Sequence, residues 1–192
     1  KKLPIISGVS CTTQALVPLL FTLDNVFGLN SVLMTEIHAT TADQMVLDQA
    51  HRDLRRARAA GHNMIPTTSS SINATLQVMP HLDGKINGYS IRVPTINVAC
   101  IDITVTFDRY VTLDELKTQL KTASQTSLKN IMAYNELPLV SSDFIGDTHS
   151  LVVDDEYIMQ AGTAFKIMAW YDNEVGYANR LLDMCNKLNN CL

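Results

Sequence analysis

Apolar residues recur at helical spacing in several parts of the chain. In the first such segment, leucines fall on one face and Gly28 follows as a typical helix end. Another opens with a capping box, in which Thr112 precedes Glu115 by three positions. The expected helices are residues 14–27, 68–80, 112–124 and 173–190.

Alternating apolar and polar residues predict β-strands elsewhere, most clearly in "NVACIDITVTF". The first strand is expected to end at His38, and residues 40–65 lack a period, so they are expected to form a long loop. The expected strands are residues 31–38, 85–94, 97–107, 150–154 and 163–171. Because these strands do not alternate regularly with crossover helices, we predict an α+β domain with a mostly antiparallel or mixed sheet and helices packed on one face.

The composition is that of an ordinary globular chain. Its 192 residues are 46% hydrophobic and 18% charged, which suits one well-buried domain over residues 1–192. A formal net charge of −4 argues against a general nucleic-acid-binding protein. The first residues lack a secretory leader pattern and no apolar run approaches about eighteen residues, so secretion and membrane insertion are not expected and a cytoplasmic location is predicted.

The cysteines give no sign of a metal site or a disulfide framework. No C-x-x-C spacing occurs, which argues against zinc and dithiol redox chemistry and indicates a reducing compartment. Cys11 lies just before the first helix, where free N–H groups and the helix dipole favour a thiolate. The alternative is a structural cysteine, in the core or at the surface, which is the ordinary placement for Cys100, Cys185 and Cys191.

A histidine and several arginines accompany this thiol in the sequence. His38 closes a strand and is either a structural residue or a base that faces a nucleophile. Arg92 ends another strand, and four arginines lie in "HRDLRRARAA". They are either solvated or ion-paired, or they form an anion site with hydroxyls near Cys11 and in "TTSSS". No G-x-G-x-x-G occurs, so this chain lacks a dinucleotide-binding unit of its own.

Six segments carry a family resemblance: "SCTT", "IHATTADQ", "HRDLRRARAA", "RVPTINV", "LVSSDF" and "WYDNEVGYANR". In their order and spacing they resemble the catalytic domain of the phosphorylating glyceraldehyde-3-phosphate dehydrogenase family, which includes erythrose-4-phosphate dehydrogenase. The resemblance implies a glycolytic, NAD-dependent oxidoreductase that assembles as a homotetramer. It also implies that an N-terminal Rossmann domain holds most of the cofactor and is absent from this chain, so that the isolated domain is expected to be inactive.

The resemblance also implies roles for individual residues. Cys11 would attack the aldehyde, with His38 as its base, and hydride transfer to the nicotinamide would leave a thioester that inorganic phosphate converts to an acyl phosphate. The substrate phosphate would be held by Thr41, Asp43 and Arg92, and the attacking phosphate by Ser10, Thr12, Arg56, Ser69 and Ser70. Asn173 and Tyr177 would contact the nicotinamide, and no metal is implied. The loop over residues 40–65 would reach a neighbouring subunit.

Departures from the family pattern leave alternatives open. Gln14 and Ala15 stand where the family has Asn and Cys, and Ser69 and Ser70 stand where it has Thr and Gly, which adds a side chain where a bare backbone approaches the anion. Thioester hydrolysis, as in erythrose-4-phosphate dehydrogenase, is therefore one alternative. A non-catalytic binding or assembly module is another, and a cysteine protease is disfavoured because no protease-like signature accompanies the thiol.

Overall fold

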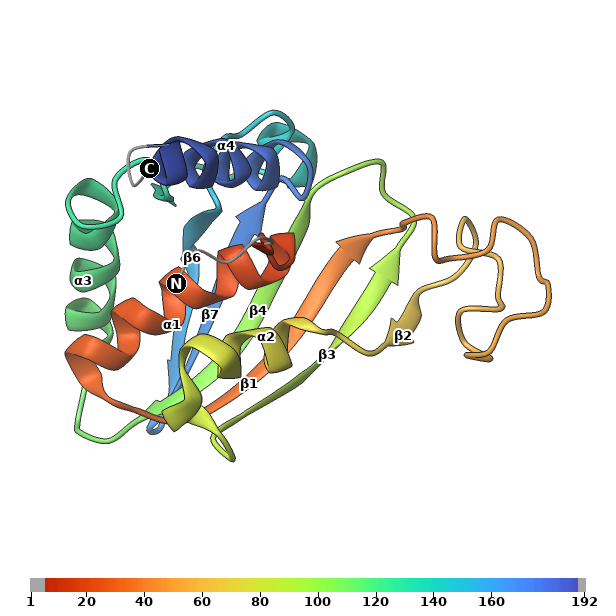
Figure 1. Ribbon diagram of the computed structural model, residues 1–192. Helices are drawn as coiled ribbons and strands as arrows, with labels where there is room; N and C mark the ends of the chain where they lie inside the picture. Colours follow the sequence, from red (N-terminus) through yellow and green to blue (C-terminus); the bar gives the residue numbers. More distant parts are fainter. Residues whose placement is uncertain (1–5, 190–192) are drawn as a thin grey trace.

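The computed structural model describes residues 6–189, which form one seven-stranded sheet with helices packed over it (Figure 1). The helices are α1 (Cys11–Phe27), α2 (Ser71–Val78), α3 (Leu113–Gln125) and α4 (Val175–Asn189), with short turns η1 (Pro80–Leu82) and η2 (Ser141–Phe144). The strands are β1 (Leu29–Ala39), β2 (Ile65–Thr67), β3 (Ile86–Val93), β4 (Ala99–Phe107), β5 (Met132–Asn135), β6 (Leu151–Ala161) and β7 (Ala164–Tyr171).

The sheet is mixed, and its strands lie in the order β2-β3-β1-β4-β7-β6-β5. Strand β1 pairs in parallel with β3, as β5 does with β6, whereas the other neighbouring strands are antiparallel. This arrangement confirms the predicted α+β class. It also gives β1 a partner on each side, so that the strand ending near His38 lies inside the sheet.

Helix α1 crosses the sheet and provides the centre of the core (Figure 1). Its predicted apolar stripe is confirmed, because Leu16, Leu20 and Leu23 are fully buried. The helix begins three residues before the predicted start, since the Ser10 side chain accepts the Thr13 N–H and caps it. Its first residue is thus the cysteine singled out above.

Some elements differ from their predicted bounds. Strands β2 and β5 were not expected, and β6 continues past residue 154 to Ala161 with a register shift after Val153. Helix α2 is shorter than predicted at both ends. The predicted cap of α3 is half formed, because Thr112 accepts the Glu115 N–H while the Glu115 carboxylate pairs with Arg109 instead.

Residues 40–64 form a loop without helix or strand, which extends to one side of the sheet (Figure 1). The predicted loop is confirmed except at its last residue, because Ile65 begins β2. Cys100 is buried in β4 and Cys185 is exposed on α4, whereas Cys191 lies outside the described residues. Within residues 6–189, no helix is both long and apolar enough to cross a membrane. The same residues contain no cluster of three or more His, Cys, Asp or Glu side chains placed for a metal ion.

Candidate active site

One cavity of about 500 Å³ collects almost all of the predicted site residues. The predicted residues that line it are Ser10, Cys11, Thr12, His38, Thr41, Asp43, Arg56, Ser69, Ser70, Arg92 and Asn173. Two further residues line the cavity. Thr68 belongs to the "TTSSS" segment expected to supply hydroxyls, whereas Glu36 was not predicted. Tyr177 does not line this cavity. Its hydroxyl lies instead beside Gly8, in the segment that precedes α1.

Regular backbone geometry brings these side chains together from distant parts of the sequence. Cys11 occupies the first turn of α1, where backbone N–H groups have no partner within the helix. Glu36 and His38 are two residues apart on β1 and therefore share one face of the sheet. In the parallel register of β1 and β3, Arg92 is the direct partner of His38.

The thiol and the imidazole form a direct pair, with Cys11 Sγ 3.5 Å from His38 Nε2. Burial raises the pKa of the Cys11 thiol, and the Glu36 carboxylate adds to this, although the Thr12 hydroxyl opposes it. Burial and the Arg92 guanidinium lower the pKa of His38. Both shifts favour a neutral thiol beside a neutral imidazole over the thiolate predicted from the helix terminus alone.

Two groups of opposite kind approach the other nitrogen of His38. The carbonyl oxygen of Ala39, which can only accept, lies 2.7 Å from Nδ1. Nη1 of Arg92, which can only donate, lies 2.6 Å from Nδ1 and 3.2 Å from the Ala39 oxygen. These partners favour opposite tautomers of the ring. With a hydrogen on Nδ1, which Ala39 favours, the lone pair of Nε2 faces the sulfur.

Other side chains that were predicted to bind anions form hydrogen bonds within the protein. The Arg56 guanidinium donates to Asp43 and, through Nε, to Thr67 Oγ1 at 2.7 Å. The Thr41 hydroxyl donates to Gln44 at 3.0 Å. Arg56 is thus held by its neighbours, as a donor of a preorganised anion site is, whereas Arg52, Arg55 and Arg58 of the same loop are exposed.

Glu36 is the functional candidate that the sequence reasoning missed. Its side chain is only 2% exposed, and it accepts hydrogen bonds from Thr12 and Ser69 at 3.0 and 2.5 Å. Nη2 of Arg92 lies 3.9 Å from the same carboxylate. The signal in the sequence was a charged residue two places before His38, at a position where the alternation of the strand predicts an inward-facing side chain.

The cavity also has an unused acceptor near its edge. The side-chain oxygen of Asn173 is buried without a hydrogen-bond partner among the described residues. A buried acceptor of this kind suits an amide N–H donor such as the nicotinamide carboxamide. Asn173 therefore fits the cofactor expected for the family.

Comparisons with known proteins agree with this geometry. The family described as glyceraldehyde 3-phosphate dehydrogenase, C-terminal domain, matches residues 10–173. Glyceraldehyde-3-phosphate dehydrogenase 1 of Bacillus cereus is 45% identical over 94% of this chain and 54% of the relative. Glyceraldehyde-3-phosphate dehydrogenase 2 of Streptomyces avermitilis is 47% identical over the same shares.

A similar protein from yeast, glyceraldehyde-3-phosphate dehydrogenase 1 of Kluyveromyces lactis, is 43% identical over 94% of this chain and 55% of the relative. The chain therefore spans about half the length of these relatives. The match runs from the residue before Cys11 to Asn173 and so includes every element that lines the cavity. The chain belongs to the glyceraldehyde-3-phosphate dehydrogenase C-terminal domain family.

Proposed function

We propose that this chain is the catalytic domain of an NAD-dependent glyceraldehyde-3-phosphate dehydrogenase that forms an acyl phosphate in glycolysis. The observation that carries the proposal is the 3.5 Å contact between Cys11 Sγ and His38 Nε2 at the N-terminus of a helix. The cavity around this pair offers the cationic side chains of Arg56 and Arg92, which suit an anionic substrate.

The first chemical step belongs to Cys11 and His38. His38 Nε2 takes the thiol proton, and the thiolate attacks the aldehyde carbon to give a tetrahedral thiohemiacetal. The free N–H groups of the first turn of α1 stabilise its oxyanion. Asn173 would hold a bound NAD by offering its buried acceptor to the carboxamide, and the nicotinamide would supply the hydride acceptor. A thioester on Cys11 remains.

The phosphate groups are proposed to bind on either side of this sulfur. Arg92 and Thr41 hold the substrate phosphate. Asp43, expected at the same site, accepts from the Arg56 guanidinium and so fixes a residue of the attacking-phosphate site. When Arg92 turns toward that phosphate, Nδ1 of His38 keeps the Ala39 carbonyl as its partner and Nε2 becomes the base. Substrate binding thereby prepares the pair for proton transfer. The attacking phosphate is proposed to meet Ser10, Thr12, Arg56, Ser69 and Ser70.

A second candidate is an enzyme of the erythrose-4-phosphate type, which hydrolyses the thioester. It is favoured by the hydrogen bond from Ser69 to Glu36, because a carboxylate at this position repels an incoming phosphate.

In either case the loop over residues 40–64 is proposed to pack against another subunit of a homotetramer in the cytoplasm. Four exposed apolar side chains on this loop suit a protein contact: Val46, Leu47, Leu54 and Met64.

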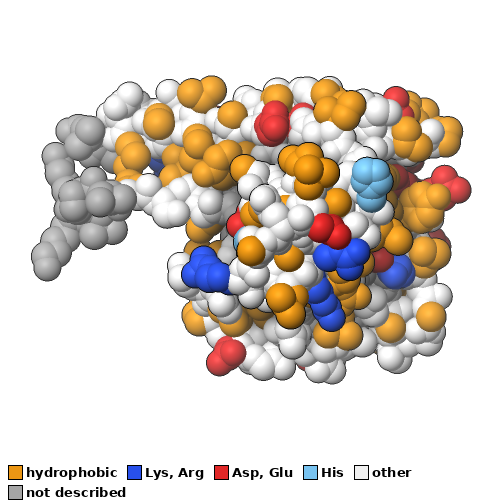
Figure 2. All heavy atoms as spheres, turned by 90° about the vertical axis from the view of Figure 1, so that its right-hand side faces the viewer, with side chains coloured by type: hydrophobic (Ala, Val, Ile, Leu, Met, Phe, Trp, Pro, Cys, Tyr) orange, Lys and Arg blue, Asp and Glu red, His pale blue; other side chains and the backbone are white. Residues whose placement is uncertain are grey.

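The surface around this loop mixes acidic, basic and apolar side chains (Figure 2). Such a mixed surface resembles the rim and core of a protein–protein interface more than a uniformly charged nucleic-acid site. It is therefore consistent with a protein partner for the loop. The proposed partner is a second copy of the same protein.

An activity assay of the full protein separates these functions. We expect NADH formation from glyceraldehyde 3-phosphate to exceed that from erythrose 4-phosphate and to depend on inorganic phosphate. Faster turnover of the tetrose without phosphate would favour the second candidate. If neither aldehyde is oxidised and neither acylates Cys11, the result would support a binding module and overturn the proposal.

A further inference from the structure

We propose that Glu36 sets the choice of nucleophile at the thioester. In this role it competes with inorganic phosphate for the site and acts as the general base that activates water. The inference rests on the proposed function, because it requires an acyl group on Cys11. It adds a catalytic residue to that site and names water as an acceptor of the acyl group, in competition with phosphate.

The carboxylate lies where the attacking anion is expected. Glu36 accepts from Thr12 through Oε1 and from Ser69 through Oε2, and both donors belong to the predicted inorganic-phosphate site. It lines the same cavity as Cys11 and is 2% exposed. The Glu36 side chain is therefore buried and held by hydrogen bonds, unlike a mobile carboxylate at the surface.

The hydroxyl hydrogens of this site are directed to Glu36. A hydroxyl has one hydrogen to donate, so Thr12 cannot give the same hydrogen to a phosphate oxygen while it bonds to Glu36. The Tyr171 hydroxyl, 2.8 Å from Thr12 Oγ1, then donates to Thr12. Ser69 is arranged in the same way, since Ser71 Oγ lies 2.7 Å from its oxygen. At Thr12 and Ser69, an arriving phosphate meets lone pairs and a negative charge in place of donors.

A neutral water molecule has the opposite preference. It can donate to Glu36 and carries no charge for the carboxylate to repel. Thr12 Oγ1 lies 3.0 Å from Glu36 Oε1 and 3.9 Å from Cys11 Sγ, so the carboxylate and the sulfur flank the same hydroxyl. Water bound to Glu36 in this cavity is consequently close to an acyl group on that sulfur.

The step balances without any further reactant. Glu36 takes a proton from water as the oxygen forms a bond to the thioester carbonyl carbon. The tetrahedral intermediate then expels the Cys11 thiolate, breaking the carbon–sulfur bond and releasing a carboxylic acid. The Cys11 thiolate takes up one proton to restore the resting thiol, Glu36 releases the proton it took from water, and the carboxylic acid ionises in solution. No oxidation or reduction takes place in this half-reaction.

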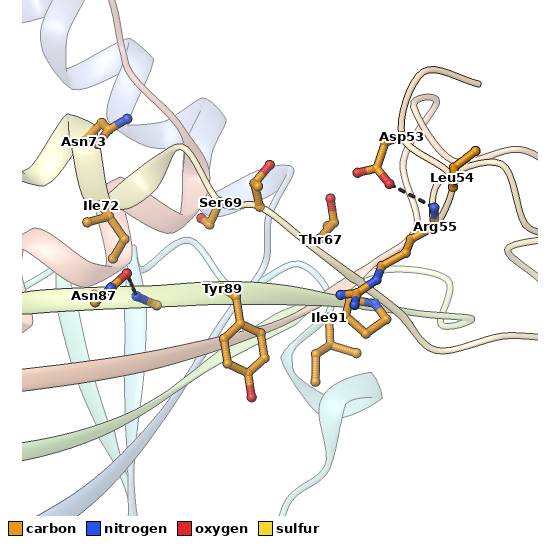
Figure 3. A pocket seen from close by; sticks show the side chains of 13 residues that line it. Asp53, Leu54, Arg55, Thr67, Ser69, Ile72, Asn73, Asn87, Tyr89 and Ile91 are labelled. Atoms are coloured by element: carbon orange, nitrogen blue, oxygen red, sulfur yellow. Dashed lines mark hydrogen bonds between the residues drawn. The ribbon is translucent and has the colours of Figure 1, made fainter.

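Solvent has an additional approach to this pair. A groove of about 920 Å³ lies between the loop, α2 and β3, and its lining includes Ser69 together with Thr67 and Tyr89 (Figure 3). Ser69 lines both this groove and the cavity that holds Cys11. The residue that donates to Glu36 thus lies between the groove and the cavity on the substrate side.

The test isolates deacylation from hydride transfer. The full protein is acylated with p-nitrophenyl acetate, where the nitrophenol burst reports acylation, and the loss of the acetyl group from Cys11 is followed by mass spectrometry over a range of inorganic phosphate concentrations. Acetate and acetyl phosphate are quantified. Glu36→Gln keeps the shape of the side chain but removes its charge and basicity, and Glu156→Gln, at an exposed position on β6, is the matched control.

For Glu36→Gln we expect hydrolysis of the acyl-enzyme to slow by about a hundredfold, as for loss of a general base. The phosphate concentration that half-saturates deacylation should fall at least about tenfold, since the competing negative charge is removed. Glu156→Gln should match the wild type in both. Unchanged hydrolysis and unchanged phosphate dependence in Glu36→Gln would overturn the inference.

Two further outcomes are distinguished by the same experiment. No acetyl group on Cys11 in the wild type would contradict the proposed nucleophile and hence the proposed function itself. If Glu36→Gln fails to fold, the wild type decides: acetate that forms alongside acetyl phosphate, and forms more slowly in D₂O, supports the base. A deacylation that requires phosphate and yields only acetyl phosphate overturns it.

Discussion

The thiol of Cys11 depends on the side chain that faces it. Since burial raises its pKa, its reactivity should come from proton transfer to His38. We expect His38→Asn to slow alkylation of Cys11 by iodoacetamide at neutral pH, whereas the exposed Cys185 is unaffected and serves as an internal reference. Peptide mapping after brief labelling measures both rates.

The pH dependence of this labelling has a definite sign. A raised pKa means that the wild-type rate at Cys11 should still increase as the pH passes the ordinary thiol value of about 8.5. Cys100, whose pKa burial raises to about 12, should stay unlabelled throughout. Equal Cys11 rates in the wild type and the His38 variant would show that the imidazole does not take the proton.

Arg92 is expected to recognise the phosphate of the substrate. Its Nε is buried without a partner among the described residues, so a donor remains for a ligand. Arg92→Ala should raise KM for glyceraldehyde 3-phosphate by about 10- to 150-fold, corresponding to a charge-assisted hydrogen bond of about 1.5–3 kcal/mol. KM for unphosphorylated glyceraldehyde should change far less. Equal losses on the two aldehydes would contradict the assignment.

At the scale of single residues, eleven of the twelve site residues predicted from sequence motifs line one cavity of the structure. The motifs could not identify Glu36, because its role arises from contacts with Thr12 and Ser69, 24 and 33 positions away. They also could not include the burial of Cys11 and the nearby carboxylate, which raise the pKa of the thiol and are properties of the folded protein. Charge states of buried groups depend on neighbours that a single segment does not reveal.

Among the helices, α4 depends on one buried carboxylate that precedes it. Asp172 Oδ1 accepts the N–H groups of Glu174 and Val175, and Oδ2 accepts that of Gly146. Burial alone would raise the pKa of Asp172, but these N–H bonds outweigh it and lower the pKa. The ionised carboxylate therefore stabilises the fold at neutral pH. Helix α4 begins at Val175, whose N–H group this carboxylate accepts.

We expect Asp172→Ala to lower the free energy of unfolding by about 1–3 kcal/mol, because buried N–H groups lose their acceptor. Since the folded pKa is depressed, this contribution is present above the unfolded value of about 3.9 and is lost as the pH falls through the folded value. Urea unfolding at pH 7 and at acidic pH measures both effects. Asp83→Ala, at an exposed position, should change little, and an equal loss there would contradict the cap.

Patterns predicted the long elements well and the short ones poorly. The apolar stripe of α1 and the alternation of β4 match the structure because burial follows the period. Strand β5 has only four residues, too few for a period to be recognised. Helix α2 starts after Ser70, because Ser69 turns its side chain toward Glu36 in the sheet. That contact outweighs local helix propensity.

For the molecule as a whole, the close approach of β3 to β1 holds the site in register. Gly88 on β3 faces Met34 on β1, and a Cβ at Gly88 would meet the backbone oxygen of Met34. Four residues further along the same pair of strands, Arg92 lies beside His38. Separation of the strands at Gly88 would thus disturb both the sheet and the cavity.

Gly88→Ala should lower the free energy of unfolding by about 1–3 kcal/mol through overpacking between the strands. It should also slow Cys11 labelling, since Arg92 and His38 shift with them. Thermal melting and the iodoacetamide assay measure the two effects. Gly61→Ala is the matched control, because a Cβ there meets nothing within 4 Å. The same loss of stability in both variants would contradict this explanation.

The central claim is that oxidation passes through a thioester on Cys11. The full protein is mixed with NAD and glyceraldehyde 3-phosphate without inorganic phosphate, quenched with acid within one turnover, and digested for mass spectrometry. The account predicts a phosphoglyceroyl adduct on the Cys11 peptide in an amount equal to the NADH formed. NADH formation with an unmodified Cys11 peptide, or with the adduct on Cys100 or Cys185, would contradict it.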